Sequence, residues 1–274
     1  MSNSNPLNLS KSTSGDYRIP IKAIFLEAWY RVKGMKAVFW GGFLYFILVM
    51  GAACVLMGLI LALYDVFVLP LATAHSALSF YHLKLGLKFI VVGIVEMIRF
   101  LLTASLAYLA LKHLRNEPIH ARMAFSFRHA WRPLLWIALL LYLLNSFILS
   151  SASLLLHSAF QQPLFFLGPI LGSIFSLLIF LICFFLYFYF SIIVFMTVLL
   201  ILDQKLLIKQ SLSLAFVSVN QHVFKNIFLI IMTSIVFGIL VLITLGMGLI
   251  WLLPMTSLVT AIQYNQIFCE GNLV

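Results

Sequence analysis

The sequence predicts an all-α fold: a polytopic membrane helix bundle of six transmembrane helices, with three cytoplasmic interfacial amphipathic helices and both termini cytoplasmic. Of the 274 residues, 64% are hydrophobic and only 9% are charged, whereas soluble domains carry about 25% charged residues. The apolar runs are long enough to cross a bilayer, since about 20 residues span the ~30 Å hydrocarbon core. A net charge of +10 would suggest nucleic acid as a partner of a soluble protein. Here the basic residues lie in short loops between apolar runs, so no nucleic-acid partner is expected.

The first part of the chain predicts a tail, an interfacial helix and a span. Residues 1–18 are rich in Ser and Asn and are expected to be a disordered tail. The tail lacks the apolar core of a cleavable signal peptide. The segment from Ile19 to Lys36 places apolar residues on one helical side and basic residues on the other, as in helices that lie among lipid headgroups. The first span follows from Val38 to Leu63, with small residues suited to close helix packing.

The second span and the second unit repeat this order. An apolar loop from Tyr64 to about Leu87 leads to the second span, Phe89 to Leu111. The basic connector Lys112–Pro133 predicts another amphipathic segment, and the third span covers Leu134 to about Leu156. After a short outer turn, residues 164–202 contain no charge. A helix of that length would far exceed the membrane at 1.5 Å per residue, so the Gly-Pro pair at 168–169 should break it before a fourth span.

The third unit ends the chain. The connector Asp203–Asn226 is amphipathic again, and the fifth span runs from about Val223 to Leu245. Gly246 and Gly248 flank a tight turn before the sixth span, Leu249–Phe268. We therefore expect one transmembrane domain, residues 19–274, built from three units of an interfacial helix plus a hairpin, at 19–111, 112–202 and 203–268.

The distribution of Lys and Arg orients the bundle. Six lie before the first span, five in the second connector and three in the third, so 14 of the 17 share one side. By the positive-inside rule that side is cytoplasmic, and both termini lie on it. The basic and Trp side chains of these connectors are expected to contact anionic lipid headgroups. They are Lys22, Trp29, Arg31, Lys33, Lys36, Arg122, Arg128, Trp131, Arg132 and Lys209.

Two charges lie near the centre of the second span. A charge at that depth costs at least ~2.5–3.5 kcal/mol, and it normally faces protein or water. The i, i+3 spacing of Glu96 and Arg99 puts both on one helical face, where they can pair, and Thr103 extends this polar stripe. We expect the bundle to enclose the stripe, either as a ligand site or as an ion pair that only fixes packing. Further polar residues expected to converge on it are Asn145, Ser146, Thr260 and Gln263.

Signs of catalysis, metal binding or a cofactor are weak. The three cysteines are scattered, and no His, Cys or Asp spacing typical of a metal site occurs. No Gly-rich phosphate loop appears, and the serine after Gly172 lacks a nearby base in the sequence. We therefore expect no cofactor, no metal and no enzymatic activity.

The pattern resembles the six-helix bacterial inner-membrane proteins of the YciC type, which are related to the membrane region found beside some glycerophosphodiester phosphodiesterases. The resemblance lies in Glu27-Ala28-Trp29, in the stretch with Ser211, Ala215, Phe216 and Ser218, and in Gly246, Gly248, Pro254 and Tyr264. It covers most of the chain and implies a multi-pass protein of the bacterial cytoplasmic membrane. No phosphodiesterase domain occurs, so that activity is not implied.

Three functional hypotheses remain open. The first is a non-enzymatic protein that binds or moves a lipid-like or amphiphilic molecule, with the polar stripes forming a cavity near the midplane. The second is a membrane scaffold or assembly subunit that recruits a protein partner through its cytoplasmic helices. The third is a lipid-modifying membrane enzyme. Membrane lipids are the expected partners in each case, and the sequence leaves oligomerisation open.

Overall fold

The computed structural model describes residues 9–67, 77–161 and 168–269, and within these ranges the chain is helical almost throughout, without a β-strand. The elements in these ranges are α1 (Leu9–Ser14), α2 (Ile21–Phe67), α4 (Ala77–Leu114), the 3-10 helix η1 (Ala121–Ala130), α5 (Trp131–Gln161), α6 (Gly168–Gln204), α7 (Ile208–Gln221), α8 (Val223–Ile243) and α9 (Leu249–Phe268). The predicted all-helical class is confirmed. Residues 1–8, 68–76, 162–167 and 270–274 lie outside the described residues.

Five of the described helical segments are long and apolar enough to cross a membrane: Ile21–Phe67, Leu83–Leu114, Ala121–Ile148, Leu177–Gln204 and Val223–Ile243. The sixth predicted span forms a helix with the expected ends, α9. It is not among the five, because the polar run from Gln263 to Gln266 lowers its hydropathy.

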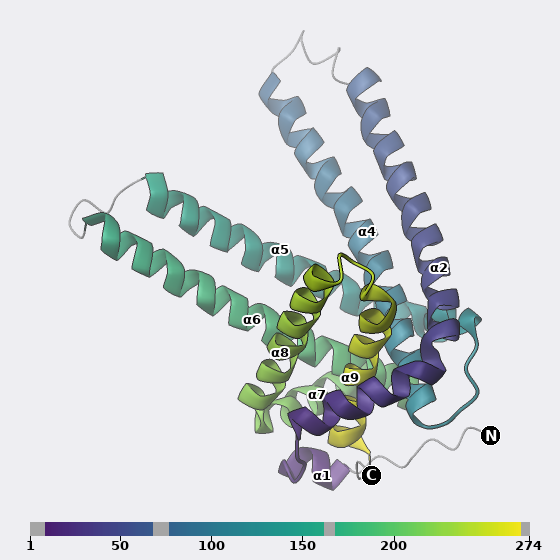
Figure 1. Cartoon of the computed structure of the whole chain (residues 1–274). Coiled ribbons are helices and arrows are strands. Elements are labelled where there is room, and N and C mark those ends of the chain that lie inside the picture. Colours follow the sequence, from purple (N-terminus) through teal and green to yellow (C-terminus); the bar gives the residue numbers. More distant parts are fainter. Residues whose placement is uncertain (1–8, 68–76, 162–167, 270–274) are drawn as a thin grey trace.

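The long helices form two hairpins that diverge from a common base (Figure 1). One hairpin is α2 with α4, and the other is α5 with α6; α1, α7, α8 and α9 lie at the base. We call this base the basic end, because it carries the start of α2, the connector 115–130 and the connector 205–209, with most of the cations. The main apolar core lies here and joins residues of α2, α4, α6, α7, α8 and α9.

Helix α9 is the centre of the base. It packs mainly against α2 and α4, and from Ala261 to Tyr264 its side chains are buried without interruption. A helix buried in this way is apolar on all sides, or its polar side chains have hydrogen-bond partners. The buried Gln263 meets this requirement by donating to Oδ1 of Asn226 on α8 at 2.9 Å.

A proline inside α9 creates a contact with α2. Pro254 has no N–H to donate to the carbonyl of Ile250, four residues earlier. The indole Nε1–H of Trp40 donates to that carbonyl instead, at 3.1 Å, and the Lys36 ammonium lies 3.7 Å from the centre of the Trp251 ring. The start of α9 is therefore beside the point where α2 leaves the base.

The structure corrects the prediction of a separate first interfacial helix. Residues 21–67 form one helix, although Figure 1 shows it bending between its first turns, which cross the base, and its long segment beside α4. Ile24, Ala28 and Val32 are fully buried in the core. The apolar side of this segment therefore covers protein, not lipid. The same holds for α7, where Ala215 and Val219 are fully buried.

The structure also corrects the prediction of disorder for residues 9–18, the described part of the predicted tail. Residues 9–14 form α1, and the segment after it packs onto α7 through hydrogen bonds. The Tyr17 hydroxyl donates to the carbonyl of Ser218 at 2.5 Å, and Gln221 Nε2 donates to the carbonyl of Thr13 at 3.0 Å. Burial raises the pKa of Tyr17, and a hydrogen bond with Asn226 partly offsets this, so the phenol stays a neutral donor. Composition alone does not reveal such a docking surface.

We expect Tyr17→Phe to loosen this N-terminal segment. Losing one hydrogen bond costs about 1 kcal/mol, which raises the population of the undocked segment ~5-fold, and proteolysis follows that population when docking is fast. Trypsin cleavage after the exposed Arg18 should accelerate by this factor in detergent-solubilised protein. Tyr30→Phe, at an exposed site, is the control. Equal cleavage rates in all three proteins would mean that the bond does not hold the segment.

Candidate functional site

A buried ion pair closes the base. Arg115 follows the end of α4, and Asp203 lies in the last turn of α6. Their side chains are only 7% and 5% exposed, and Nη1 of Arg115 lies 2.5 Å from Oδ1 of Asp203. Its Nη2 donates to Oδ2 at 2.9 Å and to the Cys269 sulfur at 3.3 Å, while the Tyr264 hydroxyl donates to Oδ2 at 2.9 Å. Burial lowers the pKa of Arg115, but the hydrogen bond and charge of Asp203 outweigh this and leave it above its ordinary value.

The residues that end α4 and α6 direct the chain around this pair. Asn116 has φ 58° and Lys205 has φ 54°, both left-handed. Asn adopts this conformation readily as a helix cap, and the N–H of Glu117 bonds the carbonyl of Lys112 at 3.0 Å across it. Lysine is uncommon there. Its conformation ends α6 immediately after Asp203 and carries the Lys205 side chain toward α4.

The predicted Glu96–Arg99 pair forms, with Arg99 Nη2 and Glu96 Oε2 2.6 Å apart. Asn145 and Ser146 of α5 lie in the same groove, about 330 Å³, together with Tyr187 of α6. We call this the Arg99 groove. The Oδ1 atom of Asn145 is buried and has no hydrogen-bond partner among the described residues. Four predicted site residues thus come together.

Two expectations about this stripe are wrong. The bundle does not enclose the pair, because the protein leaves Arg99 53% and Glu96 39% exposed. The polar stripes also do not converge in one cavity. Thr260 and Gln263 line a different groove of about 420 Å³ between α6, α8 and α9, and Thr103 donates to the Arg99 carbonyl within its own helix. The divergence of the hairpins separates these residues.

The predicted headgroup contacts fall into two groups. Lys36 and Arg31 have protein partners, since Arg31 pairs with Glu27 at 3.0 Å and also donates to the carbonyl of Leu114 at 3.0 Å. Arg132 stacks over Trp131, 5.3 Å from the ring centre. The residues that are exposed at the basic end are Lys22, Trp29, Lys33, Arg122, Arg128, Trp131, Arg132 and Lys209.

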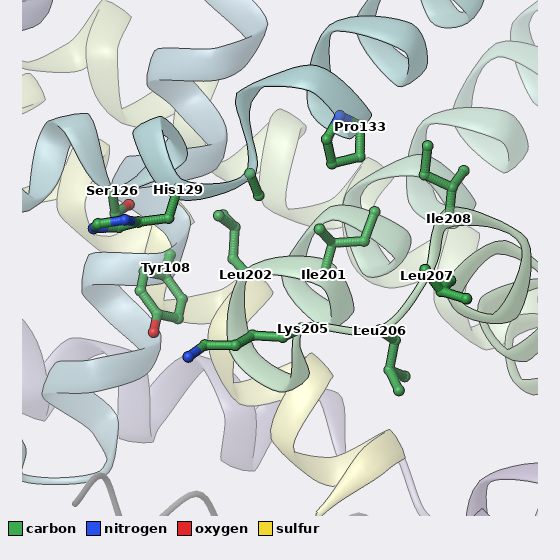
Figure 2. Close-up of a pocket in the computed structure, with 11 residues that line it drawn as sticks. Tyr108, Ser126, His129, Pro133, Ile201, Leu202, Lys205, Leu206, Leu207 and Ile208 are labelled. Atoms are coloured by element: carbon green, nitrogen blue, oxygen red, sulfur yellow. The ribbon is translucent and has the colours of Figure 1, made fainter.

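A large hollow lies at the basic end, between α4, η1, the start of α5 and the end of α6. This basic-end pocket has a volume of about 880 Å³. Figure 2 shows that polar and apolar side chains line opposite sides of it. On one side lie Tyr108, Ser126, His129 and Lys205, and on the other Pro133, Ile201, Leu207 and Ile208.

A second hollow adjoins this pocket and shares Tyr108, Ser126 and His129 with it. Its volume is about 800 Å³, and its wall adds Lys112, His120 and Arg122. None of the described residues that line either hollow is acidic, although Lys112 pairs with Glu117 at 2.7 Å. The Ser126 Oγ is buried and has no hydrogen-bond partner in the described part of the chain. The two hollows together offer cations and polar groups beside an apolar wall.

Sequence reasoning did not identify this pocket or the Arg115–Asp203 pair. A signal for the pair was present, because Asp203 ends the uncharged run 164–202 and Lys205 follows two residues later. A signal for the pocket was the step from Lys205 to three apolar residues, 206–208. Neither pattern indicates which residues its side chains contact, because those residues lie on other helices.

The described residues contain no group of three or more His, Cys, Asp or Glu side chains that could hold a metal ion. No family model, curated protein or solved structure matches the chain. Kinship with the YciC-type proteins therefore stays a prediction, and any functional conclusion has to come from the geometry.

We expect the Arg115–Asp203 pair to be strongly coupled and the Glu96–Arg99 pair weakly coupled. Removing one member of a buried pair costs about 3–5 kcal/mol, whereas replacing both by apolar residues is often nearly neutral. Asp203→Leu and Arg115→Met should each lower the free energy of unfolding by that amount, and the double variant should recover most of it. Unfolding in detergent of the singles and the double measures the coupling.

The matched cycle uses Glu96→Leu and Arg99→Met, whose wild-type side chains are far more exposed. Its coupling energy should be smaller than that of the Arg115–Asp203 pair, because the protein buries neither side chain. Additive effects in the Arg115–Asp203 cycle would contradict the role assigned to this pair.

Proposed function

We propose that the protein is a non-enzymatic, multi-pass protein of the bacterial cytoplasmic membrane that binds or moves a lipid-like amphiphile. In this proposal both termini and the basic end are cytoplasmic, and the helices form six spans. The observation that carries it is the basic-end pocket. This pocket has a volume of about 880 Å³, and its apolar wall lies opposite His129 and Lys205. An amphiphile needs both kinds of surface, and pockets of this size suit small organic ligands.

The surroundings of the pocket support access from a lipid leaflet. The pocket lies at the end of the bundle where cations gather, and anionic headgroups attract such cations by about 1 kcal/mol each. Large apolar side chains are exposed along both long hairpins, including Leu48, Phe147 and Leu178. Contiguous exposed apolar surface of this kind suits contact with lipid.

A scaffold that recruits a protein partner is the second candidate. In this hypothesis the partner docks on the cytoplasmic amphipathic segments, for which their apolar faces would have to be free. Two of these faces are occupied by the protein's own core, through Ile24 and Ala28 of α2 and Ala215 of α7. They are therefore less suited to an external partner than the sequence suggested. A lipid-modifying enzyme remains the third candidate, for which neither pocket supplies paired acids.

The topology can be tested with reporter fusions. Because α2–α4, α5–α6 and α8–α9 are each hairpins, both chain ends should lie on one side. Fusions at Asn5 and Asn272 should both give a cytoplasmic signal, as the positive-inside rule requires. A fusion in the outer loop at His75 serves as the opposite control. An external signal from either terminal fusion would refute the arrangement.

Lys205 provides a test of binding. Lys205→Gln keeps a side chain of similar length but removes one cation from the pocket wall, which should lower the anionic phospholipid that co-purifies with the protein ~5-fold, for ~1 kcal/mol. Lys88→Gln, an exposed cation on α4 away from the basic end, should leave the amount unchanged. Lipid bound per protein would be measured by mass spectrometry. Equal losses in both variants would indicate a nonspecific charge effect, and a wild-type protein without bound lipid would refute the proposal.

A further inference from the structure

The basic-end pocket and the Arg99 groove lie along the same three helices. Tyr108 of α4, Pro133 of α5 and Ile201 of α6 line the pocket. The groove is lined by Arg99 and Glu96 of α4, by Asn145 of α5 and by Tyr187 of α6. The two hollows are therefore two openings of a single seam between α4, α5 and α6.

The openings are close together along this seam. Arg99 and Tyr108 are nine residues apart on α4, which corresponds to about 14 Å at 1.5 Å per residue. On α6, Tyr187 and Ile201 are fourteen residues apart, or roughly 21 Å. Both separations are shorter than the ~30 Å hydrocarbon core. A polar headgroup that reached the groove would have crossed a large part of the apolar barrier.

One apolar cluster separates the openings. Its members at the groove are Phe100, Ala138 and Leu141, and its members at the pocket are Ile201 and Leu202. Between them we define the seam plug as Ala104, Leu134, Ile137, Val194 and Val198, of which Ala104, Leu134 and Val198 have no exposed surface. The plug consists of small and medium side chains without a hydrogen bond or charge. Opening the plug itself therefore breaks no polar contact, whereas beside the groove the Tyr142 hydroxyl of α5 donates to the Phe89 carbonyl of α4 at 2.7 Å.

Both openings carry groups that suit a phosphate diester with a polar substituent. The pocket offers the Lys205 ammonium and the His129 imidazole. In the groove, Arg99 stays half exposed and, among the described residues, pairs with Glu96 at 2.6 Å, so a phosphate would share the guanidinium with this carboxylate. The unpartnered Oδ1 of Asn145 is an acceptor for a hydroxyl or ammonium donor. Beside the groove, Ile90, Leu140 and Leu143 are exposed, so acyl chains can remain in lipid while the headgroup occupies the seam.

We infer that the α4–α5–α6 seam is a path along which the headgroup of a glycerophospholipid moves between the basic-end pocket and the Arg99 groove, with the seam plug as its barrier. This inference rests on the proposed function and adds to it an activity: movement of the lipid toward the other leaflet. Arg99 offers the phosphate a charged partner at the far end of the path. The cost of placing a phosphate among apolar side chains is lowered only where such partners are prearranged.

The test uses the full chain reconstituted into phosphatidylcholine vesicles that contain a minor share of fluorescent NBD-phosphatidylglycerol. Dithionite, which does not cross the bilayer, destroys the fluorescence of the outer leaflet only. Wild-type vesicles should lose the inner-leaflet signal as well, at a rate that increases with protein per vesicle. Binding is measured separately, as the phosphatidylglycerol that remains on the purified protein.

Three variants and one control, Val32→Ala, locate the path. Val198→Trp fills the seam plug and should slow movement several-fold, and Val198→Ala should accelerate it several-fold. Val32→Ala removes the same atoms from another fully buried site, in α2, and should leave the rate unchanged. Arg99→Gln should slow movement but keep the lipid bound at the pocket. Size-exclusion profiles and unfolding temperatures of all variants are compared with those of the wild type to show that each variant folds. If Val198→Trp does not fold, the rate of lipid movement with Val198→Ala tests the path.

The outcomes separate this inference from the proposed function. Wild-type protein that binds phosphatidylglycerol without moving it overturns the inference and leaves the binding function standing. Folded Val198 variants with wild-type rates overturn the path as well. Protein that neither binds nor moves the lipid overturns both. Parallel vesicles with NBD-phosphatidylethanolamine distinguish recognition of the phosphate, which gives equal rates, from selection for net negative charge.

Discussion

The structure depends on one buried interaction, the ion pair between Arg115 and Asp203. Each charge would be costly to bury alone, because the interior cannot replace its hydration. The pair therefore requires the end of α4, the end of α6 and the last turns of α9 to meet at one level, where Tyr264 and Cys269 add further hydrogen bonds. The buried packing of α9 against α2 and α4 is consistent with this common level.

The same interaction positions the candidate pocket. Lys205, two residues after Asp203, has a left-handed conformation, and this sharp end of α6 brings its side chain to the wall that Tyr108 and His129 share. The apolar residues 206–208 then form the opposite wall before α7 begins. Fixing the base while the two long hairpins diverge (Figure 1) leaves the seam plug between α4, α5 and α6 closed by apolar contacts. The proposed movement of a lipid depends on this combination of a fixed base and an apolar plug.

Much of the fold could be predicted from local patterns. The ends of α9 match the predicted span, and α7 and α8 form where the periodicity and apolar runs predict them. Gly168 begins α6 where the Gly-Pro pair predicts a break. The predictions that are wrong concern what each surface touches. The apolar face of Ile24 and Ala28 looked suited to lipid but is covered by α9 and its neighbours, and a Ser-rich segment that looked disordered docks through Tyr17.

The sequence by itself determined the class of the protein and its short-range contacts. Its apolar runs require helices of membrane-spanning length, and the i, i+3 spacing of Glu96 and Arg99 makes them pair whatever surrounds them, because both follow from the geometry of one helix. Only the tertiary structure decided which polar groups are buried together. Arg115 and Asp203 are 88 residues apart, and Tyr17 and Ser218 are 201 apart. In a chain that is 64% hydrophobic, many helix rotations bury equal apolar area, so the choice among them depends on a few polar contacts between helices that no local pattern encodes.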